Sequence, residues 1–305
     1  MRRLVWFLLL GACSSSTPAA VDAGVDADTG PSPEDHVFGG DRPVVFFRSP
    51  EGADPKKPLP LIVVLHGYGA SGLLQSVYFR LDKLVDEKQF LLVAPDGSSN
   101  KGGPRFWAAV DGCCEADGKK VDDVKWIKGL VDEIASVWTV DPKRIFLVGH
   151  SNGGAMAYRL ACEPSHPFAA AFLLAPAFFE AHTACAPTQP ISIRHLHGTA
   201  DETVAYDGGT IGLLGPTLSF VSAPKAVAAF AAHNGCAATP DESAPAVDLD
   251  LDLAGAETKP ARYLGCRDGV ATELYTLAGA KHVPLNLTPE IGRQIWSFFE
   301  AHPRR

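Results

Sequence analysis

The stretch that decides the fold is residues 145–154, which read IFLVGHSNGG. The first four residues form a continuous apolar run, which is typical of a strand covered on both faces of a sheet. Gly149, Ser151 and Gly153 follow at two-residue spacing, and a helical segment begins at about residue 153. A serine on a sharp strand-to-helix turn has strained backbone, and glycines on either side remove Cβ atoms that would collide there. The stretch therefore predicts a nucleophile elbow; a glycine-rich turn with an ordinary capping serine is the alternative.

From about residue 36 the chain alternates short apolar runs with longer helical periods. Over residues 121–138 apolar residues recur every three or four positions, with Asp122 and Asp123 at the favourable amino end. Asp141-Pro142 predicts a turn into the next strand. Further helices are expected at about 153–162, 224–233 and 289–302, and strands at 44–47, 59–65, 90–93, 145–148, 169–174, 191–196 and 272–277.

This alternation continues without an internal linker, which predicts one α/β domain over residues 36–305. Because most of the strands are apolar on both faces, we expect a mostly parallel central sheet covered by helices on both sides. Residues 238–262 are expected to form an irregular excursion with a short strand-like stretch at 247–253.

The amino terminus has the layout of an export signal. Two arginines precede the apolar run Leu4–Leu10, and small residues follow it, so residues 1–12 are predicted to be a signal peptide. Leu10-Gly11-Ala12-Cys13 resembles the bacterial lipobox, which predicts lipidation of Cys13. Residues 14–35 contain no Leu, Ile, aromatic, Lys or Arg, so 13–35 are predicted to be a lipidated cysteine and disordered tether. A short buried helix or a misassigned start is the alternative.

Charge and hydropathy exclude several classes of protein. The formal net charge is −8, and a nucleic-acid binder would show a basic stripe instead. Without Arg2, Arg3 and the five acidic residues of the tether, the folded part carries about −5, from which no charged partner follows. No apolar run reaches the roughly 18 residues that a membrane span needs. The only membrane contact expected is through a lipid on Cys13, which predicts a cell-envelope lipoprotein or an extracellular protein.

Seven cysteines are an odd number, but six remain if Cys13 carries lipid. An even count in an exported protein predicts disulfides. Cys236 and Cys266 are the expected pair because they flank a self-contained, loop-rich segment. Adjacent cysteines 113 and 114 are expected to reach different partners, with cysteines 162 and 185 available, and the sequence leaves these pairings open. A zinc site is not expected, because there is neither a CxxC spacing nor a nearby histidine pair.

A nucleophilic serine needs a base and an orienting acid. In an α/β-hydrolase the chain order is serine, acid, histidine, with each residue at the carboxyl end of a strand. Asp201 follows the strand predicted at 191–196 and is the expected acid, with Glu202 as the competing choice. His282 lies between the strand predicted at 272–277 and the last helix, and it is the expected base to Ser151.

The other histidines are expected to be structural. His302 lies at the end of a helix, and His150 should point away from the serine beside it. Histidines 66, 195 and 197 lie at strand ends, where structural hydrogen bonding is expected.

The oxyanion hole needs two backbone donors. One is expected to be the N–H of Asn152, directly after the nucleophile. The other is expected from the turn after an early strand, Leu65-His66-Gly67-Tyr68-Gly69, with the N–H of Tyr68 as the candidate. Phe106 and Trp107, together with the Tyr68 phenol, are candidates to line an acyl-binding cleft, with plain core packing as the alternative.

Taken together, these segments resemble the secreted polyhydroxybutyrate depolymerase-like and feruloyl esterase-like serine hydrolases over roughly residues 40–300. The resemblance implies the α/β-hydrolase fold, a Ser151–Asp201–His282 triad, and no metal or organic cofactor. The stretches that carry it are Pro58–Gly69, Phe106-Trp107, Cys113-Cys114, Val121–Val124, Gly149–Cys162 and His197–Asp201.

One segment departs from the family. Similar proteins usually carry a glycine before the catalytic histidine and a Trp-Pro-Gly-like stretch after it. Here residues 280–285 read AKHVPL, so Pro284 keeps the register while the bulky aromatic residue is absent and Lys281 has entered. Substrate preferences of the family therefore do not carry over directly.

The sequence thus favours an exported serine carboxylesterase that works through an acyl-enzyme. Its expected partner is an ester substrate, either a feruloyl- or acetyl-type ester on polysaccharide or a polyhydroxyalkanoate-type polyester or oligomer, and no nucleic acid. An inactive binding lipoprotein with the same fold and a peptidase of the same fold are the alternatives.

Overall fold

The computed structural model describes residues 33–115, 117–118, 120–182, 187–212 and 217–305. The expected signal peptide, the lipidation site Cys13 and nearly all of the tether lie outside these ranges, as does Cys185. The described chain begins with a 3-10 turn, η1 (Pro33–Asp35).

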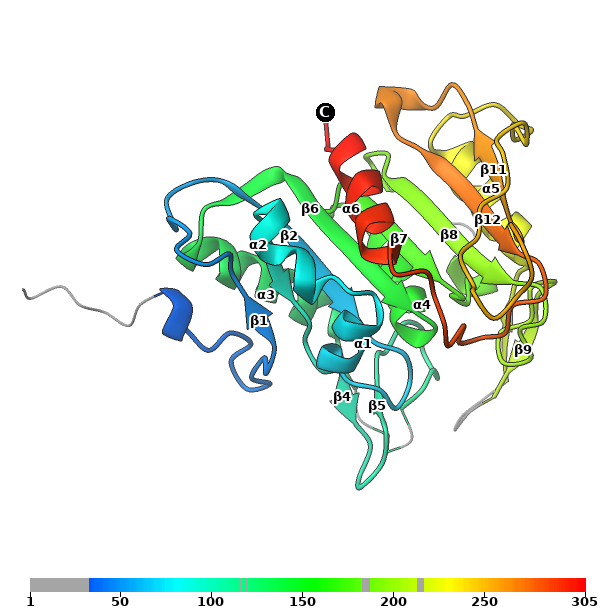
Figure 1. Cartoon of the computed structure of the whole chain (residues 1–305). Helices are drawn as coiled ribbons and strands as arrows, with labels where there is room; N and C mark the ends of the chain where they lie inside the picture. Colours follow the sequence, from blue (N-terminus) through cyan, green and yellow to red (C-terminus); the bar gives the residue numbers. More distant parts are fainter. Residues whose placement is uncertain (1–32, 116, 119, 183–186, 213–216) are drawn as a thin grey trace, which may run out of the picture.

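An eight-stranded sheet forms the centre of the molecule (Figure 1). Its spatial order is β1-β3-β2-β6-β7-β8-β12-β11, in which only the outermost pairs, β1 with β3 and β11 with β12, are antiparallel. The strands are β1 (Phe47–Arg48), β2 (Leu59–Leu65), β3 (Leu91–Val93), β6 (Val140–His150), β7 (Ala170–Leu174), β8 (Ser192–Gly198), β11 (Thr258–Tyr263) and β12 (Thr272–Leu277). The mostly parallel sheet of a single α/β domain is confirmed.

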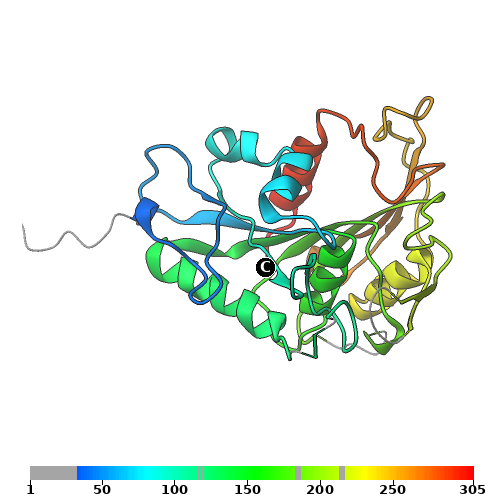
Figure 2. The same ribbon diagram turned by 90° about the horizontal axis from the view of Figure 1, so that it is seen from below.

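Helices cover both faces of this sheet, as Figure 2 shows. The helices α3 (Asp123–Val137), α4 (Asn152–Ala161) and α5 (Ala223–His233) pack against one face, where Leu61, Val63 and Leu147 point. The helices α1 (Gly72–Tyr78), α2 (Val85–Lys88) and α6 (Ile291–Ala301) lie on the other face, where Ile62, Val64 and Phe146 point. Successive strand residues point to opposite faces, so the continuous apolar runs supply both cores.

The remaining elements are short. Two small hairpins pair β4 (Ser98–Ser99) with β5 (Arg105–Phe106), and β9 (Gly209–Ile211) with β10 (Leu218–Phe220). Short 3-10 turns are η2 (Asp82–Leu84), η3 (Glu180–His182) and η4 (Arg267–Gly269). No helix in the described ranges is both long and apolar enough to cross a membrane.

Three sequence-based expectations fail locally. Asp141-Pro142 does not form a turn, because β6 runs through both residues from Val140. Within the described chain, positions 141–144 pair with no neighbouring strand, so the N–H that proline lacks is not needed there. Residues 247–253 form only isolated bridges, whereas 258–263, expected to be irregular, pair with β12 as the edge strand β11.

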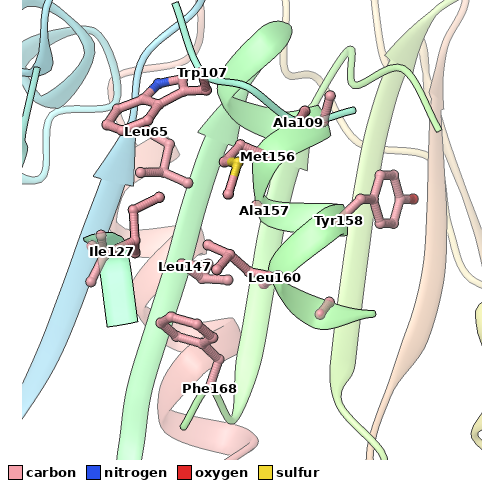
Figure 3. Packing of buried hydrophobic residues seen from close by; sticks show 14 of the residues in the cluster. Leu65, Trp107, Ala109, Ile127, Leu147, Met156, Ala157, Tyr158, Leu160 and Phe168 are labelled. Atoms are coloured by element: carbon pink, nitrogen blue, oxygen red, sulfur yellow. The ribbon is translucent and has the colours of Figure 1, made fainter. Parts of the chain in front are cut away.

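The core beneath the elbow is built around α4 (Figure 3). Met156 and Leu160 from this helix face Leu65 and Leu147 of the sheet, and all four side chains are fully buried. Glycines and alanines at other positions of α4 let the helix lie close to β6 and β7. The helix that begins at the predicted nucleophile is thus fixed by packing along its length.

The carboxy-terminal helix is fixed by aromatic stacking. Phe299 of α6 stacks on Phe146 of β6 with ring centroids 4.5 Å apart and an interplanar angle of 2°. Trp296 stacks on Phe90 at 5.1 Å. The helix buries residues 291, 292, 295, 296, 298 and 299, which is the three- and four-residue spacing of one helical face.

Replacing Phe299 by alanine should lower the free energy of unfolding by about 3–5 kcal/mol, because it empties a fully buried aromatic site. Denaturant unfolding monitored by circular dichroism measures the change. Glu300→Ala, at the exposed neighbouring position, is the control and should stay within about 0.5 kcal/mol. Similar losses for the two variants would contradict the assigned packing.

Candidate active site

Ser151 lies at the junction of β6 and α4 in a conformation that few side chains adopt. Its backbone has φ 53° and ψ −118°, and its N–H donates to the carbonyl of Leu174 at 2.9 Å. A Cβ on Gly149 would lie 2.5 Å from the Gly153 oxygen, and one on Gly153 would lie 2.2 Å from the Leu65 oxygen. Both glycines are therefore required by close backbone approach, which is the geometry of a nucleophile elbow.

Three side chains from separate strand ends meet at this turn. The Nε2 atom of His282 lies 2.8 Å from Ser151 Oγ, and its Nδ1 atom lies 2.7 Å from Asp201 Oδ2. His282 follows β12 and Asp201 follows β8, both of which run parallel to β6 in the sheet. The carboxyl ends of parallel strands lie at one edge, so residues far apart in sequence converge there.

The environment of Asp201 keeps its carboxylate ionised. Its Oδ1 accepts the backbone N–H groups of Thr203 and Val204, each at 2.8 Å, and its side chain is fully buried. Burial opposes ionisation, but hydrogen bonds from His197 and His282 outweigh it and hold the pKa of Asp201 well below its usual value. Glu202, the competing acid, is exposed to solvent.

His150 contacts the site more closely than its sequence position suggests. Its Nε2 lies 3.1 Å from the backbone carbonyl of His282, and the two rings are 5.2 Å apart. Burial, together with the positive charge of His282 when protonated, lowers the pKa of His150 to about 4. A neutral His150 therefore donates to the backbone carbonyl of His282. His66 and His302 make hydrogen bonds to backbone groups.

The residues expected to supply the oxyanion donors lie beside Ser151. A Cβ on Gly67 would lie 3.5 Å from Ser151 Cβ, so the turn after β2 lies directly against the serine. Asn152 is the first residue of α4, where a helix leaves backbone N–H groups without an intrahelical acceptor. Its side chain is used elsewhere, since it exchanges hydrogen bonds with the N–H and carbonyl of Trp107 at 2.7 and 2.9 Å.

Two cavities meet at Ser151, and both are lined by Tyr68, Ser151 and His282. The first, here called the inner cavity, has a volume of about 180 Å³. The second, here called the outer cavity, has a volume of about 340 Å³. The inner cavity is completed by residues 113, 114, 152, 155, 177, 179, 203, 204 and 211, and the outer cavity by residues 67, 70, 74, 75, 78, 150 and 283.

Phe106 and Trp107 line neither cavity, which corrects the expectation that they form an acyl-binding cleft. Both side chains are fully buried in the core, and the Trp107 indole donates to the His66 carbonyl at 3.1 Å. Trp107 bonds to the turn after β2 through His66 and to the start of α4 through Asn152. The cysteine pair in the loop after β5 lies in the wall of the inner cavity instead.

That pair is joined in a way the sequence analysis did not foresee. Cys113 and Cys114 are bonded to each other, not to different partners, and both sulfurs lie within 4 Å of the Asn152 side-chain amide. Cys236 and Cys266 are bonded to each other, and Cys162 is also disulfide-bonded. Adjacency in sequence was the available signal for the first bridge.

In the described ranges, no cluster of three or more His, Cys, Asp or Glu side chains could hold a metal ion. The donor groups gathered at Ser151 are a hydroxyl, an imidazole and a carboxylate already bonded to one another.

The comparisons with known proteins agree with this architecture. Residues 51–211, which include Ser151 and Asp201, match the family described as phospholipase/carboxylesterase. The chain belongs to this phospholipase/carboxylesterase family. An acetyl xylan esterase from Aspergillus awamori has a similar fold, with a TM-score of 0.52 at 14% identity over 84% of this chain and 93% of that one. The expected α/β-hydrolase fold is confirmed.

Among curated proteins, this family member is similar to enzymes named feruloyl esterase. It is 27% identical to feruloyl esterase B of Piromyces equi over 83% of this chain and 44% of that protein. It is also 27% identical to feruloyl esterase C of Emericella nidulans over 84% of this chain and 83% of that protein. The chain spans less than half the length of the first curated relatives it matches. The expected resemblance to feruloyl esterase-like hydrolases is confirmed.

Two buried histidines should make the folded protein less stable at low pH. The folded-state pKa of His150 and His166 is about 4, below the unfolded value of 6.5, so the unfolded chain binds more protons between these values. The free energy of unfolding should therefore fall as the pH drops from 6.5 to 4, by up to about 3 kcal/mol for each histidine. Protonation of Asp201, whose pKa is lowered, adds a loss only below its unfolded value near 4.

Urea unfolding at pH 7.5 and pH 4.5 measures this dependence. His166 lies beside Arg304 and lines neither cavity. His166→Gln should therefore reduce the loss of unfolding free energy at low pH and leave the site unchanged. An identical loss in the wild type and the variant would contradict the assignment.

Proposed function

We propose that this chain is a serine carboxylesterase with Ser151 as nucleophile, His282 as general base and acid, and Asp201 as the orienting acid. The observation that carries the proposal is the continuous hydrogen-bonded row from Ser151 Oγ through the imidazole to Asp201. It is supported by membership of the phospholipase/carboxylesterase family and by similarity to proteins named feruloyl esterase.

In the proposed reaction, Ser151 Oγ attacks the ester carbonyl while His282 Nε2 takes its proton. Asp201 holds the Nδ1–H tautomer and stabilises the imidazolium that forms. The backbone N–H groups of Asn152 and Tyr68 receive the developing oxyanion, a contribution worth a few kcal/mol for each donor. His282 then returns the proton to the leaving alcohol, and water hydrolyses the acyl-enzyme by the same steps in reverse order.

The two cavities accommodate the two halves of the ester on either side of Ser151. The inner cavity is walled by Phe179, Ile211 and the Cys113–Cys114 disulfide, so it suits an apolar group. The outer cavity includes Leu74 and Val283, which are 64% and 41% exposed. Exposed apolar residues 73, 77 and 285 lie on the same two segments, which the Tyr78–Pro284 hydrogen bond joins.

Candidate substrates are feruloyl- or acetyl-type esters on polysaccharide and oligomers of hydroxyalkanoate. The curated relatives favour the first class. The apolar outer cavity favours the second, because a hydroxyalkanoate chain is apolar on both sides of its ester bond whereas a sugar is polar.

The enzyme is also proposed to be exported, with residues 1–12 as signal peptide, lipid on Cys13 and residues 14–35 as tether. The disulfides Cys113–Cys114 and Cys236–Cys266 support export, since such bonds persist in oxidising compartments.

Ser151→Ala should abolish turnover of p-nitrophenyl acetate, with kcat falling by at least about 10⁴-fold, because no other group supplies the nucleophile. Steady-state kinetics measure the loss, and circular dichroism shows that the variant is folded. Ser136→Ala, on the exposed side of α3, is the matched control and should retain full activity. Activity retained by Ser151→Ala, or wild-type protein that a fluorophosphonate probe leaves unlabelled, would refute the proposed function.

Val283→Asp should discriminate between the two substrate classes. A charge in the apolar outer cavity should lower kcat/KM for a hydroxybutyrate trimer about tenfold, while methyl ferulate, with its small alcohol, changes less than about threefold. Leu264→Asp is the control, because Leu264 is 53% exposed and lines neither cavity. Equal losses on both substrates would contradict a role for the outer cavity in selecting an apolar ester.

A further inference from the structure

Behind Asp201, a row of three buried side chains continues the hydrogen bonding away from the cavities. Tyr158 Oη, from α4, lies 2.7 Å from His195 Nδ1. His195 Nε2 lies 2.9 Å from His197 Nδ1, both residues being on β8. His197 Nε2 lies 2.8 Å from the Val204 carbonyl and 3.2 Å from Asp201 Oδ2. None of the three is more than 1% exposed.

The end of the row at Val204 fixes the position of one proton. A carbonyl and a carboxylate oxygen can only accept, so His197 Nε2 must carry hydrogen to lie 2.8 Å and 3.2 Å from them. In a neutral ring Nδ1 is then an acceptor, which requires a proton on His195 Nε2.

The end at Tyr158 fixes the same direction independently. His195 Nδ1 is left as an acceptor and receives the Tyr158 hydroxyl proton. In the reverse direction that hydroxyl proton would need another acceptor, and none lies within hydrogen-bond distance among the described residues. Burial raises the pKa of Tyr158 and lowers that of His195, so these two groups stay uncharged. Every proton in the row is therefore assigned.

His197 acts on both halves of the turn that presents the acid. Val204 donates its N–H to Asp201 Oδ1, and its carbonyl accepts the His197 proton, so the imidazole closes the turn from residue 201 to residue 204. The same Nε2–H faces Asp201 Oδ2, the oxygen bonded to His282. Removing this donor would leave the Val204 carbonyl without its imidazole partner and Asp201 Oδ2 with only the His282 hydrogen bond.

We propose that His197 is a positioning residue of the triad, held in its Nε2–H tautomer by a one-directional row of hydrogen bonds from Tyr158 through His195. The proposal rests on the proposed function, because positioning Asp201 matters only if His282 serves Ser151. A positioning role differs from plain core packing in one respect. It requires a hydrogen-bond donor at the Nε2 position of residue 197, whereas packing requires only a side chain of that size.

Two substitutions separate these roles. In His197→Gln the amide nitrogen can occupy the Nε2 position and keep a donor toward Val204 and Asp201. In His197→Asn the shorter side chain places its oxygen near the Nδ1 position, so it can accept from His195 but loses the donor. Both variants replace the ring by an amide, and thermal unfolding of each variant measures the packing that it loses.

His197→Asn should lower kcat on p-nitrophenyl acetate about 10- to 100-fold with KM within about twofold, because a hydrogen bond to a charged group is lost. His197→Gln should restore most of the lost kcat. If His197→Asn and His197→Gln have equal kcat, the proposal is overturned, whatever their thermal stability.

Nitrogen-15 NMR of the wild-type imidazoles supplies a readout that needs no turnover. At neutral pH His195 and His197 should both show the neutral Nε2–H tautomer; a neutral Nδ1–H tautomer or an imidazolium at either would overturn the row. The two failures can be told apart. Unlabelled wild-type protein with a fluorophosphonate probe would refute the proposed function, whereas labelled, active protein with a wrong tautomer would refute only the role of His197.

Discussion

The positive backbone angle of Ser151 is the constraint on which the rest of the site depends. A non-glycine residue at φ 53° is sterically unfavourable, so it persists only where its surroundings determine it. The surroundings here are close backbone contacts. The Ser151 N–H donates to the Leu174 carbonyl, and the glycines on either side leave room for the backbone of α4 and of β2 where a Cβ atom would collide. Packing of α4 against the sheet holds the helix start in place. The position of the Ser151 hydroxyl at the two cavities is thus a consequence of how β2, β6 and β7 pack together.

Around that turn, hydrogen bonds hold the Asp201 carboxylate and the Asn152 side chain. The carboxylate of Asp201 accepts four hydrogen-bonding groups, two from the backbone and two from imidazoles, so its buried charge is stabilised. The Asn152 side chain is bonded to the backbone of Trp107, so the first residue of α4 is held in place at the helix start. Core residues and site residues are therefore one network, and Trp107 contributes by fixing backbone, not by touching substrate.

Much of the fold and of the candidate site could be predicted from the amino-acid sequence. The strands 59–65 and 272–277 have the expected bounds. The first is an almost entirely apolar run, and the second combines β-branched, aromatic and leucine residues between turn residues. The order of Ser151, Asp201 and His282 could be read because each follows a strand. The strand 258–263 was missed because an edge strand with one solvated side lacks a continuous apolar run. The bond between Cys113 and Cys114 was missed because pairing depends on how the backbone of the loop after β5 places the two sulfurs.

By itself the sequence determined the α/β architecture, the elbow at residues 149–153 and the three residue types a triad requires, since these follow from local periodicity, backbone sterics and chain order. Only the tertiary structure decided which side chains share a hydrogen bond across the sheet. His195 and His197 look alike in sequence, and as residues i and i+2 of β8 they share a face of the strand. Only His195 is bonded to Tyr158, however, and only His197 reaches Asp201. The cavity walls were likewise set by packing between distant segments, because a side chain's neighbours depend on how strands and helices stack and not on its own position in the chain.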